Sequence, residues 1–120
     1  MRVEDVMSTP VIITSRNVKV KHLRETFERK EVGALPVLEA DGTISGIVSL
    51  RDILGADDEQ IVQDIMSDHI HIVLPNNRLS DAANTMVLKG VHHLVVMKDG
   101  NVVGMLSALD IVREYAVLTK

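Results

Sequence analysis

The 120-residue sequence contains no cysteine, and this absence excludes several kinds of chemistry. Disulfides, thiolate metal sites, iron–sulfur clusters and cysteine nucleophiles all require a thiol. A chain without disulfides fits a reducing, intracellular setting, so we expect a cytoplasmic protein.

Aromatic residues and positive charge are also scarce. Phe27 and Tyr115 account for the whole 2% of aromatic residues, too few for a stacking platform that would hold single-stranded nucleic acid. Acidic residues outnumber basic ones by 17 to 13, which gives a formal net charge of −4. Nucleic-acid interfaces need an excess of lysine and arginine, so this balance argues against one.

Long hydrophobic runs are missing as well. The apolar runs are a handful of residues long, far short of the roughly 20 needed to cross a bilayer. Glu4 and Asp5 stand where a secretory peptide would carry an apolar block, so we expect neither a membrane span nor a secretory leader. The composition of 46% hydrophobic and 25% charged residues is that of an ordinary globular protein.

The most informative feature that is present is an internal duplication. At an offset of 59 residues, Asp5, Met7 and Ser8 match Asp64, Met66 and Ser67. After a turn the offset becomes 58, and Asp52 matches Asp110. We place repeat 1 at residues 1–57 and repeat 2 at residues 58–120. Because half of this chain is small for a lone domain, we expect the repeats to share one core with pseudo-two-fold symmetry.

Each repeat predicts the element order β-α-β-β-α, which is an α/β fold. In repeat 1 the pattern predicts strands at 11–14, 35–39 and 44–49 and helices at 18–31 and 50–54. In repeat 2 it predicts strands at 70–74, 94–98 and 102–107 and helices at 79–89 and 108–116. Short helical turns at 3–7 and 61–66 begin the repeats, and Asp41-Gly42 and Asp99-Gly100 are typical hairpin turns.

Both repeats carry the pattern Ser-x-x-Asp where a strand meets a helix, as Ser49 with Asp52 and as Ser107 with Asp110. The pattern is typical of a helix cap, in which the serine oxygen and the acid satisfy free backbone N–H groups. The same geometry also suits a nucleotide, because a helix start attracts phosphate and a carboxylate can accept from both hydroxyls of a ribose. Taken alone, capping explains the pattern better; its occurrence in both repeats favours a site.

The sequence resembles a tandem pair of cystathionine-β-synthase (CBS) domains, also called a Bateman module. The resemblance covers nearly the whole chain. It rests on segments 5–8 and 64–67 at the start of each repeat, on 32–37 and 91–96 at the middle strands, and on the Gly-x-x-Ser-x-x-Asp segments 46–52 and 104–110. It implies two β-α-β-β-α CBS repeats, no catalytic activity of its own, and binding of AMP, ADP, ATP or S-adenosylmethionine in clefts between the repeats.

Carried over by position, the resemblance assigns roles to individual residues. Asp52 and Asp110 would hold the ribose, and Ser49, Ser107 and His93 would contact phosphate. The cleft of Ser107 and Asp110 would be walled by Val11, Val32, Gly33 and Ala34, and the cleft of Ser49 and Asp52 by Ile70, Val91, His92 and His93. Because the match of His93 in repeat 1 is Ala34, we expect the His93-lined cleft to prefer more negative charge.

The resemblance also implies a homodimer formed through helix faces, and an output that acts on a separate effector protein, since no effector domain fits in these residues. Two alternatives remain open. One is a ligand-free dimerisation or scaffold module whose Ser-x-x-Asp pairs only cap helices. The other is a regulator that binds metal or nucleic acid, for which the five histidines offer pairs such as His69 and His71 but no converging set of three or four donors.

Overall fold

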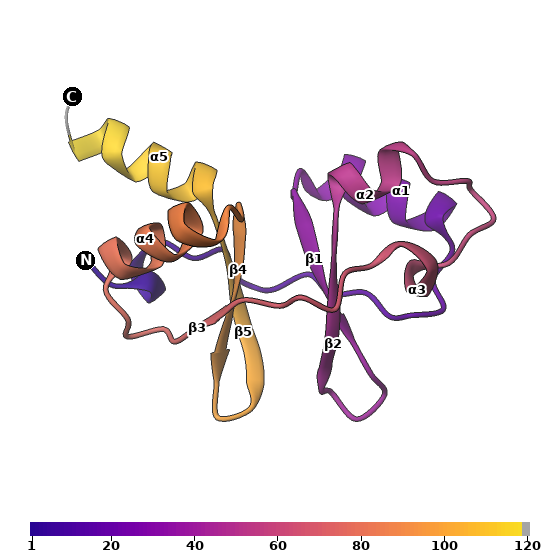
Figure 1. Ribbon diagram of the computed structural model, residues 1–120, viewed down its shortest axis with the longest axis horizontal. Helices are drawn as coiled ribbons and strands as arrows, with labels where there is room; N and C mark the ends of the chain where they lie inside the picture. Colours follow the sequence, from indigo (N-terminus) through magenta and orange to yellow (C-terminus); the bar gives the residue numbers. More distant parts are fainter. Residues whose placement is uncertain (119–120) are drawn as a thin grey trace. The chain divides into compact units, whose positions relative to one another are not determined.

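The computed structural model describes residues 1–118, and the chain divides into two compact units (Figure 1). The middle unit consists of residues 12–70. The terminal unit combines residues 1–11 with the second half of the chain from residue 71 onward. In each unit the helices cover one face of a small sheet, which is a mixed α/β architecture (Figure 1).

The middle unit is built on a β-hairpin. Strand β1 (Ala34–Leu38) runs antiparallel to strand β2 (Ile44–Ser49), and the two are joined by the predicted turn, where Gly42 has a φ of +87° that suits glycine. Three helices accompany the hairpin: α1 (Val20–Lys30), α2 (Leu50–Leu54) and α3 (Val62–Ile65).

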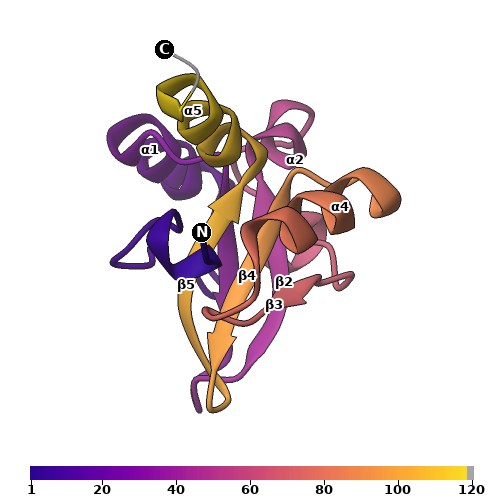
Figure 2. The same ribbon diagram turned by 90° about the vertical axis from the view of Figure 1, so that its left-hand side faces the viewer.

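The terminal unit has a three-stranded sheet in the order β3-β4-β5 (Figure 2). The short strand β3 (Ile72–Val73) is parallel to β4 (His93–Lys98), which is antiparallel to β5 (Asn101–Ser107). Its helices are the 3₁₀ turn η1 (Val3–Asp5), α4 (Leu79–Lys89) and α5 (Ala108–Leu118).

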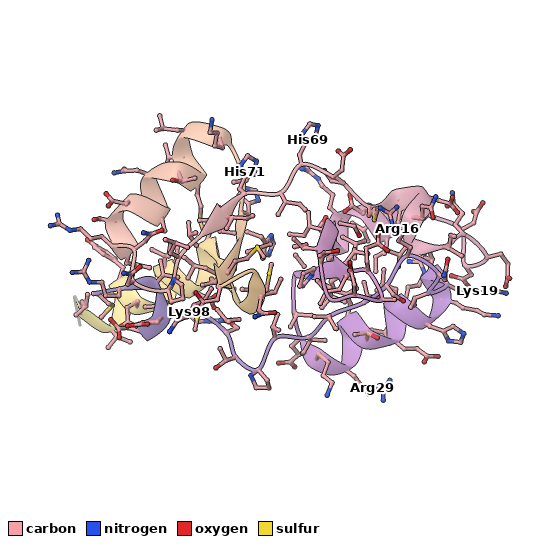
Figure 3. All side chains as sticks on the ribbon, turned by 90° about the horizontal axis from the view of Figure 1, so that it is seen from below. Arg16, Lys19, Arg29, His69, His71 and Lys98 are labelled. Atoms are coloured by element: carbon pink, nitrogen blue, oxygen red, sulfur yellow. The ribbon has the colours of Figure 1, made fainter. Side chains whose placement is uncertain are left out.

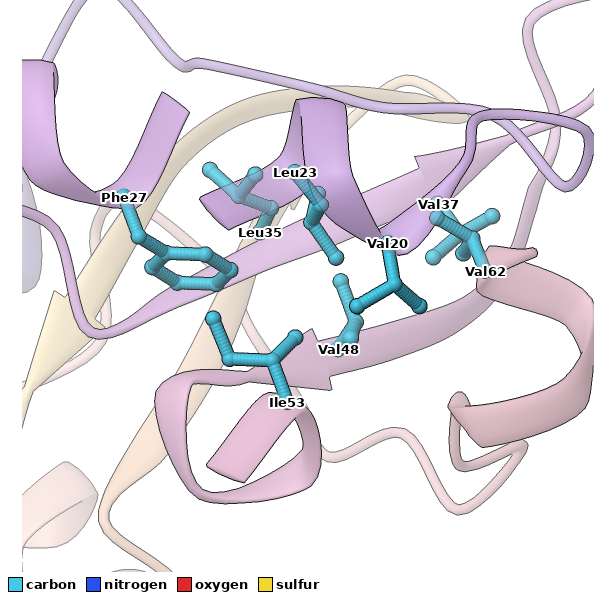
Figure 4. Close-up of a cluster of buried hydrophobic side chains, with 8 residues drawn as sticks. All are labelled: Val20, Leu23, Phe27, Leu35, Val37, Val48, Ile53 and Val62. Carbon is cyan, nitrogen blue, oxygen red and sulfur yellow. The ribbon is translucent and has the colours of Figure 1, made fainter. Parts of the chain in front are cut away.

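The core of the middle unit follows from the apolar spacing of α1. Val20, Leu23 and Phe27 lie at i, i+3 and i+7, so they share one helix face and are buried against the hairpin (Figure 4). The remaining buried members of this cluster are Leu35, Val37, Val48, Ile53 and Val62. The terminal unit repeats the arrangement with Val3, Val73, Ala82, Met86, Leu94, Val96 and Leu106.

The core therefore consists of two clusters, which corrects the expectation of one shared core. Each cluster nevertheless needs both repeats. Val62 belongs to repeat 2 but is fully buried in the cluster of the middle unit, and Val3 belongs to repeat 1 but is fully buried in the cluster of the terminal unit. The repeats have exchanged their leading segments, which we define as residues 1–11 and 58–70.

Backbone hydrogen bonds fix this exchange. In the middle unit the N–H of Val62 donates to the carbonyl of Val18 at 2.9 Å, and the N–H of Val20 donates to the carbonyl of Gln60 at 2.8 Å. In the terminal unit the N–H of Val3 donates to the carbonyl of Asn77 at 2.9 Å. Neither repeat can complete its own core, because the residue that does so comes from the other repeat.

One expected strand is reduced. The segment 11–14 pairs with the sheet only through Thr14, which forms a single parallel bridge to Val37. Its counterpart at 70–74 forms two residues of strand, β3. β-branched residues favour an extended backbone in both segments, but a strand needs a hydrogen-bonding neighbour along its length, and at 11–14 only Thr14 has one.

Gly46 and Gly104 occupy equivalent positions where another segment approaches the sheet closely. A Cβ at Gly46 would lie 2.8 Å from the carbonyl oxygen of Ser67 and 2.9 Å from the sulfur of Met66. Ser67 cannot retreat easily, because its backbone exchanges two hydrogen bonds of 2.9 Å with Ile47. At Gly104 the nearest atom is the sulfur of Met7 at 2.8 Å, which is the end of a flexible side chain.

We therefore predict that Gly46→Ala lowers the free energy of unfolding by about 1–3 kcal/mol, a typical cost of forcing an extra methyl group into a packed site. Gly104→Ala should cost less, because Met7 can move. Gly55→Ala is the control, since a Cβ there meets no atom within 4 Å. Urea unfolding measures all three, and equal stability of Gly46→Ala and Gly55→Ala would contradict the packing argument.

Candidate functional site

The first Ser-x-x-Asp junction lies where β2 ends and α2 begins. The backbone N–H of Ser49 donates to Oδ2 of Asp52 at 2.7 Å, and the N–H of Asp52 donates to Oγ of Ser49 at 3.3 Å. The Ser49 hydroxyl also donates to Oδ2 of Asp52, at 3.0 Å. The N–H of Leu50 donates to the carbonyl of Gly33, which fixes the start of α2 beside the residue before β1.

The second junction repeats this geometry between β5 and α5. The N–H of Ser107 donates to Oδ2 of Asp110 at 2.9 Å, and the N–H of Asp110 donates to Oγ of Ser107 at 3.0 Å. The N–H of Ala108 donates to the carbonyl of His92, the counterpart of the bond to Gly33. The capping interpretation is therefore confirmed at both junctions.

An aspartate also caps two other helix starts in this chain. The N–H of Ile61 donates to Oδ2 of Asp64 at 3.0 Å, and the N–H of Arg2 donates to Oδ2 of Asp5 at 2.7 Å. These two helix starts lack the serine. The junctions at Ser49 and Ser107 therefore differ from the other two helix starts by a serine hydroxyl, whereas a capping aspartate is common to all four.

The carboxylates at the two junctions differ in their second oxygen. Within the described residues, Oδ1 of Asp52 has no hydrogen-bond partner, whereas Oδ1 of Asp110 lies 3.6 Å from Nη1 of Arg113. The side chain of Asp110 is only 14% exposed, while that of Arg113 is 69% exposed. Arg113 is thus a loosely held cation beside a largely buried acid, and its match in repeat 1 is Gly55.

His93 adds a second basic group to the junction at α5. It lies directly opposite Ser107 in the β4–β5 ladder, as Ala34 lies opposite Ser49 in the hairpin. Burial lowers the pKa of His93 below its usual value, the neighbouring His92 lowers that pKa further, and Asp110 opposes both effects. Within the terminal unit, His93 therefore lies close to Ser107 and Asp110.

The expected wall residues are divided between the two units. Val32, Gly33, Ala34 and Ile70 belong to the middle unit with Ser49, and Val11, Val91 and His92 belong to the terminal unit with Ser107. Val32 and Val91 are half-buried and pack against the core of their own unit. Ala34 is 5% exposed, so it can offer a ligand little side-chain surface.

The histidine pairs do not converge with other ligands. No group of three or more His, Asp or Glu side chains among residues 1–118 is placed to hold a metal ion. The side chain of His69 is 90% exposed and projects away from the ribbon (Figure 3). None of the helices in the described part of the chain combines the length and the apolar character that a membrane crossing requires.

A groove of about 870 Å³ lies in the middle unit, away from the junctions. It is lined by residues of the 13–18 loop and by Leu38, Glu39 and Gly42 near the hairpin turn. Ser49 pairs with Ala34 at the opposite end of the hairpin. The positive charge of Arg16 in this groove is already paired with Glu39, so the groove offers no free charge that would define a ligand.

Comparison with known proteins places this geometry in a family. The model of the CBS domain matches the chain twice, over residues 3–59 and 62–117. The CBS domain-containing protein YhcV of Bacillus subtilis is 30% identical over 115 residues, which cover 91% of this chain and 81% of YhcV. The protein MJ1225 of Methanocaldococcus jannaschii is 28% identical over 116 residues, 92% of this chain, but the chain spans only 41% of its length.

Solved structures share the fold closely. CBSX2, solved in complex with AMP, has a TM-score of 0.85 and 25% identity, and the match covers 99% of this chain and 98% of CBSX2. The CBS domain pair of protein MJ0100, solved with methylthioadenosine and S-adenosyl-L-methionine, has a TM-score of 0.92 and 21% identity, with 98% of each chain covered.

The lowered pKa of His93 predicts a pH dependence of stability. Folding disfavours the protonated imidazole, so the unfolded chain takes up a proton near pH 6.5 while the folded chain resists it. Stability is therefore complete above pH 6.5 and falls as the pH drops below that value toward the folded-state pKa. Urea unfolding at pH 7.5 and 5.5 should show a smaller loss for His93→Gln than for the wild type. An identical loss in both proteins would contradict the burial argument.

Proposed function

The chain belongs to the CBS domain family, and on that premise we propose that it is a regulatory module that binds adenosine-containing ligands: AMP, ADP, ATP or S-adenosylmethionine. The observation that carries the proposal is the pair of Ser-x-x-Asp junctions, each of which adds a hydroxyl to a capped helix start. The AMP complex of CBSX2 supports the ligand class.

We propose that Asp52 and Asp110 accept hydrogen bonds from the ribose hydroxyls. In both residues Oδ2 is occupied by the N–H of the capping serine, which holds the carboxylate in one orientation. Because the capping bond uses Oδ2, the other carboxylate oxygen, Oδ1, takes no part in capping. A carboxylate that is fixed before the ligand arrives loses little conformational freedom on binding, which favours affinity.

The two junctions differ in how well they suit phosphate. The hydroxyl of Ser49 already donates to Asp52, whereas Oγ of Ser107 accepts from the N–H of Asp110 and keeps its own hydrogen available within the described hydrogen bonds. A hydroxyl is both a donor and an acceptor, so Ser107 can still donate to a phosphate oxygen. Within the terminal unit, His93 and Arg113 add basic groups near Ser107. We therefore propose that Ser49, Ser107 and His93 contact phosphate, and that Ser107 has the hydroxyl hydrogen most available for it.

Adenine would lie against aliphatic side chains, which suits a chain with two aromatic residues. We propose as its wall the residues assigned from the family resemblance: Val11, Val32, Gly33, Ala34, Ile70, Val91 and His92. Gly33 and His92 already use their carbonyls to fix the helix starts of α2 and α5. These bonds hold the backbone beside each junction in place, so that its polar groups can hydrogen-bond to the adenine base.

We propose that ligand binding changes the conformation of the module, and that this change regulates a separate effector protein. We propose that the module itself catalyses no reaction, that it works in the cytoplasm and that it acts as a homodimer. The alternative is a scaffold module that binds no ligand. The capping bonds are compatible with this alternative, because they give both serines and both aspartates a structural role.

Calorimetric titration with AMP, ADP, ATP and S-adenosylmethionine tests the proposal. Asp110→Ala should weaken binding at its junction by about 10- to 100-fold, which is what one or two hydrogen bonds to a charged group supply. Asp64→Ala is the matched control, because Asp64 makes the same capping bond at α3 without a serine. Asp64→Ala should lower stability, by about 1 kcal/mol, and leave affinity unchanged.

Two outcomes of that titration would contradict the proposal. If Asp110→Ala and Asp64→Ala leave affinity equally intact, Asp110 does not hold the ligand. If the wild type binds none of the four compounds, the protein is better explained as a scaffold module without a ligand. A thermal shift supports the titration, because a ligand at 100 times its dissociation constant stabilises the folded state by about 2.7 kcal/mol.

The assignment of phosphate to Ser107 is tested by comparing AMP with adenosine. We predict that Ser107→Ala weakens AMP by about 10-fold, the loss of one charge-assisted hydrogen bond, and changes adenosine little. AMP should also bind more tightly as the pH falls from 7.5 to 6, because phosphate favours protonated His93, and His93→Gln should abolish this trend. Equal losses for AMP and adenosine in Ser107→Ala would show that Ser107 acts only as a cap.

A further inference from the structure

Each leading segment carries a methionine at the point where it joins a sheet. Met7 and Met66 match in the duplication, and each stands directly before a serine that bridges to the last strand of its unit. Ser8 exchanges backbone hydrogen bonds of 2.8 and 3.3 Å with Met105 in β5, and Ser67 exchanges two of 2.9 Å with β2. Any change in these methionines therefore acts where the exchanged segments are attached.

A glycine makes room for each of the two sulfur atoms. The sulfur of Met66 lies 2.9 Å from the place where a Cβ on Gly46 would stand, and the sulfur of Met7 lies 2.8 Å from the same place at Gly104. Both distances are shorter than a carbon–sulfur contact allows, so each sulfur fills space that a side chain would otherwise occupy. The two methionines also pack against the core cluster of their own unit. Each thioether is thus part of the contact that holds a leading segment on its sheet.

The methionines of the chain differ in their access to solvent. Met1 is 57% exposed, whereas Met86 and Met105 are 5% and 9% exposed. Met7 and Met66 are half-buried. These two therefore combine access for a small solute with a contact on which the packing of a core cluster depends.

We propose that Met7 and Met66 are sites of oxidation by peroxides, and that their oxidation loosens the exchanged leading segments. In this reaction the thioether sulfur attacks the terminal oxygen of a hydroperoxide, an S–O bond forms and the O–O bond breaks. The sulfur is oxidised to a sulfoxide, and the peroxide is reduced to water or an alcohol, whose oxygen takes the proton of the hydroperoxide. A thioether needs no deprotonation before it reacts, so access to the peroxide sets its rate.

Oxidation turns an apolar contact into a polar one. A sulfoxide oxygen is a hydrogen-bond acceptor, and burying it without a donor is unfavourable. The cluster against which Met66 packs consists of apolar side chains, which offer no donor. The oxygen therefore has to turn toward solvent, and this movement draws the sulfur away from Gly46. Because Ser67 is the next residue, its two hydrogen bonds to β2 should weaken as well.

Met97 provides a matched control within the chain. It is half-buried as well, but it lies in β4 and, within the described residues, is not among the side chains packed against the core of the terminal unit. Its oxidation should therefore leave stability unchanged. Neither Met7 nor Met66 takes part in the nucleotide contacts proposed above, so the proposal on oxidation does not depend on the ligand site.

Treatment of the full chain with hydrogen peroxide, followed by peptide mass spectrometry, measures the oxidation of each methionine. The initial rates at Met7 and Met66 should be lower than at Met1 and several times higher than at Met86 and Met105. The melting temperature should stay constant while Met1 alone is oxidised, and it should fall by about 5 °C once Met7 and Met66 are oxidised. Methionine sulfoxide reductase should reverse the fall.

Hydrogen exchange of the same samples locates the effect in the structure. Oxidation should speed the exchange of the N–H groups of Ser8 and Ser67, which donate to β5 and β2. The N–H of Leu38 donates to the carbonyl of Thr14 in the same unit as Met66 and should stay protected, because no leading segment takes part in that bond.

Substitutions test the same contact without an oxidant. Met66→Gln places a polar group at the sulfur and should melt below Met66→Leu, which keeps the contact apolar, whereas Met97→Gln should melt like the wild type. The proposal is overturned if Met7 and Met66 oxidise as slowly as Met86, or if the melting temperature is unchanged after both are oxidised. Equal losses in Met66→Gln and Met97→Gln would also overturn it, since the contact with the glycine would then be irrelevant.

Discussion

The exchange of leading segments is the constraint on which the rest of the structure depends. Val62 and Val3 are both fully buried, and each completes the hydrophobic cluster of the unit built mainly from the other repeat. Chains of about 60 residues bury a smaller fraction of their surface than larger domains do and are marginally stable, so borrowing a buried segment matters most for bodies of this size. Because each cluster takes a buried residue from the other repeat, we expect removal of either repeat to leave the remaining core incomplete.

The two Ser-x-x-Asp junctions have the same capping geometry, although the residues around them differ. Each junction joins the last strand of a unit to its following helix, and its capping bonds stabilise that connection whether or not a ligand is present. The side chains around it are free to change. Opposite Ser49 stands Ala34, and opposite Ser107 stands His93. The same capping device thus stands opposite an alanine in one unit and a histidine in the other.

Much of the fold could be predicted from the sequence, because the duplication made each pattern visible twice. The hairpins at Asp41-Gly42 and Asp99-Gly100 and the amphipathic helices α1 and α4 follow from turn chemistry and from apolar spacing. The exchange of Val3 and Val62 could not be predicted, since a short apolar helix fits either core and no local pattern says which one it joins. Segment 11–14 was expected to be a strand because β-branched residues dominate it, but pairing depends on a neighbour that lies far away in the sequence.

The candidate site shows a similar division. The serine and aspartate roles in capping follow from their spacing alone, and the structure confirms them. The position of His93 beside Asp110 depends on the register of β4 against β5, which the sequence does not specify at the level of one residue. The capping role of Asp5 and Asp64 is not evident from the sequence, because no serine stands three residues before either of them.

The central claim is that the serine and aspartate that cap a helix also hold an adenosine ligand. The most direct measurement follows the backbone amide resonances of the isotope-labelled chain while AMP is added. The account predicts that the amides of Ser107 and Asp110 shift in a saturable way, while those of the equivalent caps at Asp5 and Asp64 stay in place. Saturable shifts at the Asp110, Asp5 and Asp64 caps alike, or at none of the three, would contradict it.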